Sequence, residues 1–228
     1  MKKSETALVI GLLTGDGHIQ NKEHRRIVSF YSKNKTIINF VEQLILKNFQ
    51  IKKTKIYVDI RDNHKRYKLF YCNSYLTKYL ISLECPFGNK TNVKFSIPSW
   101  IRENRSFTKK YLQGLFEAEG SIYTTRGKKK RTRIALEMYK NKELLKKGFA
   151  FFNQIKASLQ LFQIRSSPVR LKKGNVRKDG SESIGFVLEI EQKHFRKFYK
   201  EINFISKRKR ELLEKSLAIA GVNLKKEP

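Results

Sequence analysis

Two short stretches of similar sequence decide the fold of this chain. Residues 9–17 read Val-Ile-Gly-Leu-Leu-Thr-Gly-Asp-Gly, and residues 112–120 read Leu-Gln-Gly-Leu-Phe-Glu-Ala-Glu-Gly. Each stretch is an apolar helical pattern that ends in an acidic residue followed by glycine. Because the second stretch follows the first after about 100 residues, we expect a diverged internal repeat.

The repetition continues downstream of both stretches. The segments 30–35 (Phe-Tyr-Ser-Lys-Asn-Lys) and 137–142 (Glu-Met-Tyr-Lys-Asn-Lys) share Lys-Asn-Lys, and helical patterns follow at 37–49 and 144–161. Alternating apolar and polar residues predict strands at 55–60 and 67–72, and again at 169–172 and 184–190. Each half therefore reads helix, hairpin, helix, hairpin, helix. We place the domains at 1–105, including a linker at about 91–105 with the helix-start signal Pro98-Ser99, and at 106–228.

Small residues on the two repeated helices predict that these helices pair. Gly11 and Gly15 are four residues apart, as are Gly114 and Ala118, so each pair lies on one helical face and permits close backbone approach. We expect each helix to end at its acid and to be terminated by the following Gly17 or Gly120. Parallel pairing then brings Asp16 and Glu119 together.

Two carboxylates at two helix C-termini require a neutralising cation, because both helix dipoles are already negative there. Mg²⁺, or Mn²⁺, is the simplest candidate, since it binds carboxylate and carbonyl oxygens together with waters. The backbone carbonyls near Gly15 and Ala118 are further candidate ligands. Metal-activated water acting on a phosphodiester is the chemistry that such a site favours.

The composition restricts the class of protein. The 228 residues include 50 Lys plus Arg and 20 Asp plus Glu, a formal net charge of +30, which excludes an ordinary neutral enzyme and favours a polyanionic partner. A hydrophobic content of 39% excludes a disordered basic tail. Neither the cysteines Cys72 and Cys85 nor the scattered histidines show metal-ligand spacing. No segment has the apolar length of a membrane helix, and we expect an intracellular, cytoplasmic or organellar protein that is not secreted.

The two stretches resemble the paired signature of the LAGLIDADG homing endonucleases, and the resemblance covers nearly the whole chain. It implies an α+β fold of two pseudo-symmetric αββαββα repeats, whose antiparallel sheets form a DNA-binding saddle in a monomer. It also implies that the last acid of each motif, Asp16 and Glu119, binds metal and is catalytic. Thr14 stands where an acid is common in the family, but that position is not the metal-binding one.

The resemblance further implies a lysine near the scissile phosphates in each half. Pro86-Phe-Gly-Asn-Lys90-Thr, upstream of Ile97-Pro98, resembles the family's Gly-x-Lys segment, so Lys90 is the first candidate. In the second half Phe204-Ile-Ser-Lys207-Arg-Lys209 resembles the matching segment, with Lys207 preferred over Lys209. Such a lysine stabilises charge or positions water.

The basic residues also have a predicted place, on the strand faces that do not point to the core. We expect Ile134, Leu136, Val169 and Leu171 to face the core, and the loops 126–131 and 172–178 to contact phosphates. Ser32 and Tyr139 occupy positions that are often polar in the family. The expected DNA-binding residues are Arg25, Ser29, Ser32, Lys33, Lys55, Tyr57, Arg61, Lys68, Arg131, Arg133, Tyr139, Lys140, Arg170 and Lys172.

We therefore expect a metal-dependent endonuclease that cuts both strands of a long, non-palindromic double-stranded DNA site. One alternative is a maturase that binds intron RNA on the same fold, which needs the basic surface but not both acids. Another is a DNA-binding regulator without catalysis, which the 228-residue length disfavours because such a regulator usually carries an additional helix-turn-helix domain. We expect no membrane partner.

Overall fold

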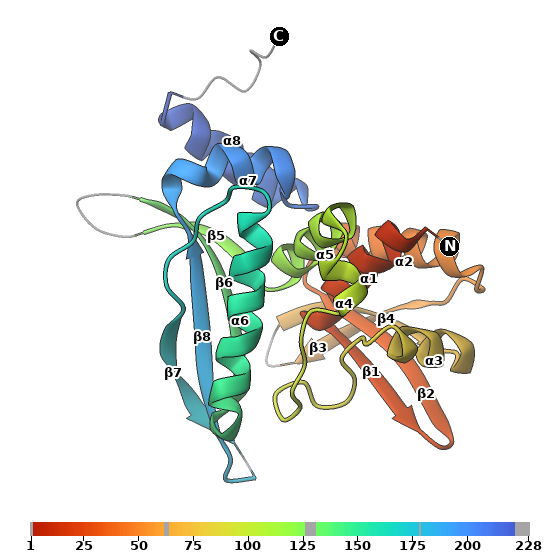
Figure 1. Ribbon diagram of the computed structural model, residues 1–228. Coiled ribbons are helices and arrows are strands. Elements are labelled where there is room, and N and C mark those ends of the chain that lie inside the picture. Colours follow the sequence, from red (N-terminus) through yellow and green to blue (C-terminus); the bar gives the residue numbers. More distant parts are fainter. Residues whose placement is uncertain (1, 62–63, 126–130, 178, 222–228) are drawn as a thin grey trace. The chain divides into compact units, whose positions relative to one another are not determined.

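The computed structural model describes residues 2–61, 64–125, 131–177 and 179–221 (Figure 1). The chain forms two compact units, residues 1–118 and 119–228. The family-based expectation of an α+β chain with two similar repeats is confirmed, since each unit contains a four-stranded antiparallel sheet with helices.

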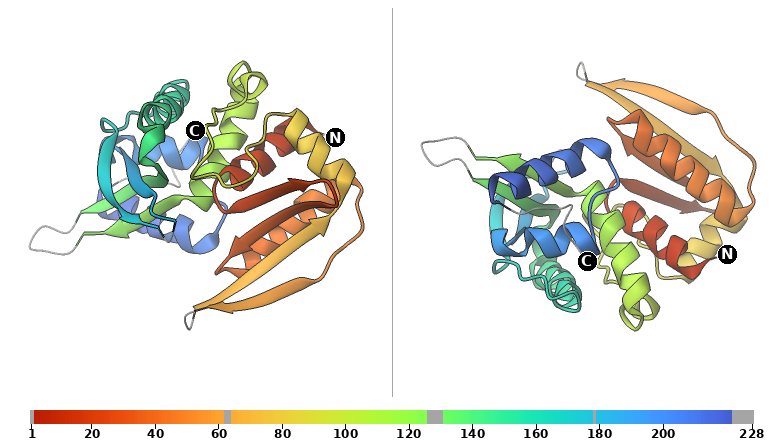
Figure 2. Two further views of the ribbon diagram at one scale, coloured as in Figure 1. Left: turned by 90° about the horizontal axis from the view of Figure 1, so that it is seen from below. Right: turned by 90° about the horizontal axis from the view of Figure 1, so that it is seen from above.

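The first unit begins with α1 (Lys3–Thr14), followed by β1 (Gly17–Lys22), β2 (Arg25–Ser32) and α2 (Lys35–Phe49). It continues with β3 (Ile56–Arg61), β4 (His64–Cys72), α3 (Ser74–Ser82), α4 (Ser99–Arg102) and α5 (Arg105–Ala118). The strand order is β1-β2-β4-β3. Helices α2 and α3 pack on one face of this sheet, which leaves the other face open (Figure 2).

The second unit repeats this order. It contains β5 (Gly120–Thr124), β6 (Thr132–Asn141), η1 (Lys142–Leu144), α6 (Leu145–Gln160), β7 (Arg170–Val176) and β8 (Glu182–Ile190). The remaining elements are η2 (Gln192–His194), α7 (Phe195–Glu201) and α8 (Lys207–Ile219). The strand order β5-β6-β8-β7 matches that of the first sheet, so the sequence repeat corresponds to a structural repeat.

The helix-covered face of each sheet carries the core. In the first unit Val28 and Phe30 of β2 are buried with Ile45 of α2. In the second unit Leu136 and Leu188 are buried with the ring of Phe186, which stacks on Phe152 of α6 at a centroid distance of 5.6 Å. Alternate residues along each strand point to the opposite, open face.

The repeated Lys-Asn-Lys segment has a local structural cause. The side chain of Asn34 accepts a hydrogen bond from the Thr36 amide at the start of α2, and that of Asn141 accepts one from the Glu143 amide at the start of η1. In both halves the asparagine is thus an N-cap that satisfies a backbone donor without a helical partner. The helix-start signal at Pro98-Ser99 is likewise confirmed, because α4 begins at Ser99.

Helices α1 and α5 pack closely within the first unit, as the small residues predict. A Cβ added to Gly11 would overlap the carbonyl oxygen of Tyr111, and one added to Gly114 would overlap that of Leu8. Thr14, whose position often carries an acid in related motifs, is buried here. Its hydroxyl donates to the Ile10 carbonyl (2.8 Å) and lies 3.5 Å from the Tyr111 hydroxyl. An uncharged residue therefore suits this position.

This packing also explains where the two units divide. The motif-based boundary lies between residues 105 and 106, but α5 belongs to the first compact unit because it packs against α1. The second unit accordingly begins at Glu119. Among the described residues, no helix combines the length and apolar character needed to cross a membrane.

The expected helix ends are wrong in detail. Helix α1 ends at Thr14 and α5 at Ala118, before their acids, and Gly17 and Gly120 begin strands β1 and β5. Among the described glycines only Gly88, Gly180 and Gly221 have positive φ, so Gly17 and Gly120 are not left-handed helix terminators. Gly17 is needed for space instead, because an added Cβ would lie 2.7 Å from Cα of Leu13.

Candidate carboxylate site and nucleic-acid interface

Asp16 lies exposed between the end of α1 and the start of β1. Its backbone carbonyl accepts a hydrogen bond from the Tyr31 amide (3.3 Å), which ties the residue to β2. Its position is thus set by the backbone of two elements, and its side chain is at the surface. This placement suits a residue that acts on an external ligand.

Lys90 supplies positive charge at the end of α1. Its ammonium donates to the carbonyl oxygens of Leu13 (2.9 Å), Thr14 (3.0 Å) and Gly15. An ammonium has three N–H groups, so these bonds match its donors to helix-end carbonyls that lack helical partners. Lys90 therefore counteracts the negative end of the helix dipole beside Asp16. The Gly15 carbonyl, an expected metal ligand, is one of these acceptors.

A second carboxylate accompanies Asp16. A small cavity of about 30 Å³ is lined by Asp16 together with Glu117 and Ala118 at the end of α5, and by Ser32 at the end of β2. Glu117 is only 6% exposed. This residue was not among the sequence candidates, although it is the first acid of the second motif and the motif spacing could have identified it.

Glu119 is the first residue of the second unit and is half-buried directly before β5. Ala118, whose carbonyl was an expected ligand, is the last residue of α5. The described residues contain no group of three or more His, Cys, Asp or Glu side chains able to hold a metal ion. In proteins Mg²⁺ is usually held by one or two carboxylates, with waters and phosphate oxygens completing the shell.

The two lysine candidates of the second unit differ in their surroundings. Lys207 is the first residue of α8, with a side chain that is 84% exposed, and its ammonium lies 3.7 Å from the Glu211 carboxylate. Lys209 is half-buried, and its ammonium lies 5.4 Å from the centre of the Phe204 ring. Lys209 is therefore the more fixed of the two, and the catalytic role of either lysine stays a prediction.

The open face of the first sheet carries the expected residues Arg25, Tyr57 and Lys68. Direct cross-strand partners share a face, and the registers Tyr31–Lys68 and Tyr57–Lys68 place these side chains together. Arg25 and Ser29 have the same parity in β2, but Ser29 is buried and its hydroxyl donates to the His18 carbonyl, so it does not present a contact surface. The side chain of Arg61 lies outside the part of the structure that is described.

Aromatic rings support the cations of this face. The ammonium of Lys68 lies 5.6 Å from the centre of the Tyr31 ring and 5.1 Å from that of Phe70, and the Arg66 guanidinium lies 5.7 Å from Tyr31. The Tyr57 and Phe70 rings stack at 5.1 Å, with Lys55 over Tyr57. Arg66 also pairs with Asp59 at 3.0 Å. Tyr31, Arg66 and Phe70 were missed. Arg66 and Phe70 lie two residues either side of Lys68 in β4, so strand alternation would have placed both on its face.

The open face of the second sheet has a different chemistry. Arg133, Arg170 and Lys172 share this face as expected, but each contacts a carboxylate. Glu189 accepts from Arg133 and pairs with Arg170 at 2.7 Å, while Glu137 accepts from Lys172 at 2.8 Å. The Tyr139 hydroxyl donates to Glu137 (2.6 Å). Hydrogen bonds from Lys172 and Tyr139 outweigh the effect of burial and lower the pKa of Glu137.

Several expectations for the second unit are wrong. Lys140 is on the helix-covered face and only 4% exposed, because its parity in β6 matches Leu136 and Met138. The segment expected as a phosphate loop at 172–178 is strand through Val176, since β7 pairs with β8. Leu171 is 46% exposed because β7 is an edge strand, and Val169, which precedes it, is half-exposed. Of the loop 126–131, residues 126–130 lie outside the described residues, and Arg131 is exposed.

Two expected contacts lie before α2. The Ser32 hydroxyl accepts a hydrogen bond from the Asn34 amide (3.1 Å), and Lys33 is exposed beside it.

His18, two residues after Asp16, is half-buried on the open face of the first sheet. Burial, followed by the positive charge of Lys90, lowers the pKa of His18, against the effect of a hydrogen bond with the Gly88 backbone. The imidazole is therefore biased towards its neutral form.

Comparisons with known proteins agree with the two-repeat fold. A family model described as a LAGLIDADG-like domain matches residues 3–82 and 106–203. A structure of I-DmoI in complex with DNA and Mn aligns with 88% of this chain and 96% of its own, at a TM-score of 0.56 and 20% identity. The homing endonuclease I-WcaI, bound to its DNA recognition sequence, aligns with 93% of this chain and 86% of its own, at a TM-score of 0.59 and 18% identity.

Curated relatives match over a part of their length. The tRNA-splicing ligase RtcB of Methanocaldococcus jannaschii is 30% identical over 183 residues, which are 73% of this chain and 19% of the ligase. The replication factor C small subunit of the same organism is 26% identical over 209 residues, which are 87% of this chain and 11% of that protein. The chain thus spans less than a fifth of the length of these two relatives.

Proposed function

Because the chain belongs to the LAGLIDADG-like domain family, we propose that it is a divalent-metal-dependent endonuclease that cuts both strands of a long, non-palindromic DNA site. The observation that carries the proposal is the repeated acid at the end of a helix motif, Asp16 after α1 and Glu119 after α5, in a chain with net charge +30. The basic open faces of two similar sheets support duplex DNA as the substrate.

In this proposal Asp16 and Glu119 hold Mg²⁺ or Mn²⁺ against the phosphodiester. A bound divalent ion would supply an activated water and stabilise charge on the phosphate oxygens. The carboxylate of Asp16 is exposed, as a ligand of a phosphate-bound ion must be. Lys90 holds the carbonyls at the end of α1 and places positive charge beside this carboxylate.

The two open faces would contact the duplex in different ways. In the first sheet, cations that lie over aromatic rings, such as Lys68, can bind phosphates. Arginine guanidinium groups can donate two hydrogen bonds to the edge of a guanine. In the second sheet Glu137 and Glu189 can accept from base amino groups, while Arg133 and Lys172 donate. Lys33, Arg25 and Arg131 are exposed beside these faces and are proposed phosphate contacts.

The curated relatives support an independent role for this segment. Two differently named proteins share it over a small fraction of their length, so the shared part is a module and not the ligase or the replication factor as a whole. A site-specific nuclease fits such a module, because it can cut DNA without the ligase or replication-factor activity of the proteins with which it shares sequence.

The test compares the wild-type chain with Asp16→Asn, Glu119→Gln and the double variant. The double variant selects binding sites from randomised duplexes, and the selected duplexes are then incubated with the wild type and Mg²⁺. We expect cleavage of both strands by the wild type, and a loss of about 10²-fold or more in rate for each single variant, the size associated with losing one charge-stabilising group. Glu23→Gln, an exposed carboxylate in the β1–β2 turn, is the matched control. Undiminished cleavage by the double variant would contradict the proposal.

A further inference from the structure

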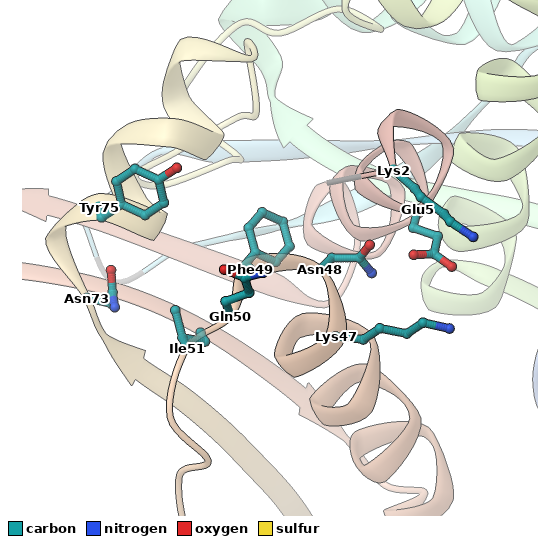
Figure 3. Close-up of a pocket in the computed structure, with 9 residues that line it drawn as sticks. All are labelled: Lys2, Glu5, Lys47, Asn48, Phe49, Gln50, Ile51, Asn73 and Tyr75. Carbon is teal, nitrogen blue, oxygen red and sulfur yellow. The ribbon is translucent and has the colours of Figure 1, made fainter.

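A second feature of the first unit lies at the other end of α1 from Asp16. A pocket of about 830 Å³ is bordered by the N-terminus of α1, the C-terminus of α2 and the first turn of α3 (Figure 3). Its volume lies within the roughly 300–1,000 Å³ of small-ligand sites. Neither the carboxylate site nor the open sheet face uses any of the residues that line it.

An exposed aromatic ring forms one side of this pocket. Tyr75 is 63% exposed, and its ring stacks on that of Tyr79 with a centroid distance of 6.1 Å and an interplanar angle of 16°. Tyr79 in turn contacts the buried Phe49 edge-on at 6.0 Å. The Asn73 side chain caps the helix by accepting from the Leu76 amide, which fixes the turn that carries Tyr75. A supported, exposed ring of this kind is a stacking platform for a nucleobase.

A carboxylate with unused hydrogen-bonding capacity forms another side. Glu5 lines the pocket and is half-buried: its Oε2 atom is enclosed without a hydrogen-bond partner among the described residues, which leaves Oε1 as the oxygen that a ligand can reach. An ionised carboxylate oxygen can only accept a hydrogen bond, so a ligand amino group is a suitable partner for this oxygen. Lys2 and Lys47 are exposed at the same side, where Figure 3 shows their side chains beside Glu5. Their ammonium groups favour an anionic ligand.

The equivalent place in the second unit shows that the fold does not require these rings. Gln50 after α2 and Gln163 after α6 both have left-handed backbone, with φ of 50° and 56°, and each borders a pocket. The second pocket, of about 640 Å³, is lined by Arg165, Lys193 and Lys197. Lysines thus follow β8 where tyrosines follow β4, so the rings belong to the chemistry of the first pocket.

We propose that the pocket of the first unit binds a short unpaired stretch of nucleic acid whose bases carry amino groups. One base stacks on Tyr75, the amino group of a neighbouring base donates to Glu5, and backbone phosphates lie near Lys47 and Lys2. RNA and single-stranded DNA both offer this chemistry. The proposal is independent of duplex cleavage, because it uses a different set of residues.

The experiment measures binding of short labelled oligonucleotides to the full chain by fluorescence anisotropy. We expect oligo(rA) to bind more tightly than oligo(rU), since uracil has no amino group. Tyr75→Ala should weaken oligo(rA) binding about fivefold or more, the lower end of the effect of losing one stacked base, and Tyr75→Phe should restore it. Glu5→Gln should reduce the preference for oligo(rA) over oligo(rU). Tighter binding of oligo(rA) than of oligo(dA) would support RNA as the source, and equal binding would support recognition of the base alone.

Tyr57→Ala is the matched control, because Tyr57 is also an exposed tyrosine but lies on the open sheet face. It should weaken duplex binding and leave oligo(rA) binding unchanged, whereas Tyr75→Ala should leave duplex binding and cleavage unchanged. Unchanged oligo(rA) affinity in folded Tyr75→Ala would overturn the proposal. Loss of duplex cleavage alone would bear on the proposed nuclease and not on this pocket.

Discussion

The open faces of the two sheets have the same strand order but hold their cations differently. In the first sheet Lys68 lies over the rings of Tyr31 and Phe70, and Asp59 is the carboxylate paired with Arg66. In the second sheet Glu137 and Glu189 contact Lys172, Arg133 and Arg170. A ring supports a cation without neutralising it, whereas a carboxylate competes with phosphate. The same fold thus provides one face suited to tight binding of DNA phosphates and one suited to discrimination between base sequences.

The interior contacts of the two units differ as well, and this difference gives the largest expected effect. Gly11→Ala would press a methyl group on the backbone of α5, which cannot move without separating the helices. Gly148→Ala in α6 would press instead on the far edge of the Phe186 ring, a side chain that yields more readily than helix backbone. We expect Gly11→Ala to cost roughly 1–3 kcal/mol of unfolding free energy, as in overpacked cores, and Gly148→Ala less.

Thermal and urea unfolding of both variants measure this contrast. Gain of helix propensity on replacing glycine by alanine, up to about 1 kcal/mol, is common to the two positions and cancels in the comparison. An equal loss of stability in both variants would show that the α1–α5 contact is no more rigid than the ring packing of the second unit.

The contrast between the sheet faces predicts opposite effects on duplex binding. Replacing Glu137 and Glu189 together by Gln releases Lys172 and both arginines, so non-specific DNA affinity should rise and its salt dependence should steepen. Lys68→Gln in the first sheet should lower affinity and reduce the slope of log K against log salt by about one. Both are measured by titration of a random-sequence duplex at several salt concentrations.

Glu182→Gln is the control for the double variant. Glu182 also pairs with a lysine, Lys142, at 2.7 Å, but its parity in β8 places it on the face opposite to Glu189. It should leave duplex affinity nearly unchanged. If the Glu137 and Glu189 double variant also binds DNA with unchanged affinity and an unchanged slope of log K against log salt, these carboxylates do not compete with phosphate for the cations of the second face.

The smallest expected effect concerns pH. Burial lowers the pKa of His18 in the first unit and of His194 in the second. The unfolded chain therefore takes up these protons first as the pH falls, and stability is lost from about pH 6.5, the ordinary histidine value, down to the lowered values. His18→Gln and His194→Gln should each flatten this part of the curve of unfolding free energy against pH. A steeper loss in either variant would contradict the assigned direction.

Much of the fold could be predicted from the sequence because local patterns specify it. The apolar stretches, the strand alternation and the repeated Lys-Asn-Lys segment led to the observed order of helices and hairpins. Helix ends were less predictable, because Gly17 and Gly120 begin strands and the acid-glycine pattern alone does not distinguish a strand start from a helix terminator. The exposure of Leu171 was missed because an edge strand has the same alternation as a central one.

The candidate site was predictable in part. Parity placed Lys68, Arg133 and Lys172 on open faces, and the same rule applied to β6 would have placed Lys140 inside. The carboxylate partners Glu137 and Glu189 were missed, since ion pairs between strands depend on register across distant segments. Likewise Lys90 was expected to act on phosphates, but its bonds to the carbonyls of α1 join residues more than 70 positions apart.

The sequence by itself determined the repeated motifs, the acids Asp16 and Glu119, the small residues of the paired helices and the excess of positive charge. These are local or summed properties, and they suffice to indicate the family. The tertiary structure decided which cations are supported by rings, which are held by carboxylates, and that Glu117 lies in the cavity beside Asp16. Such contacts form between segments far apart in the chain, and only the packed backbone brings them within reach.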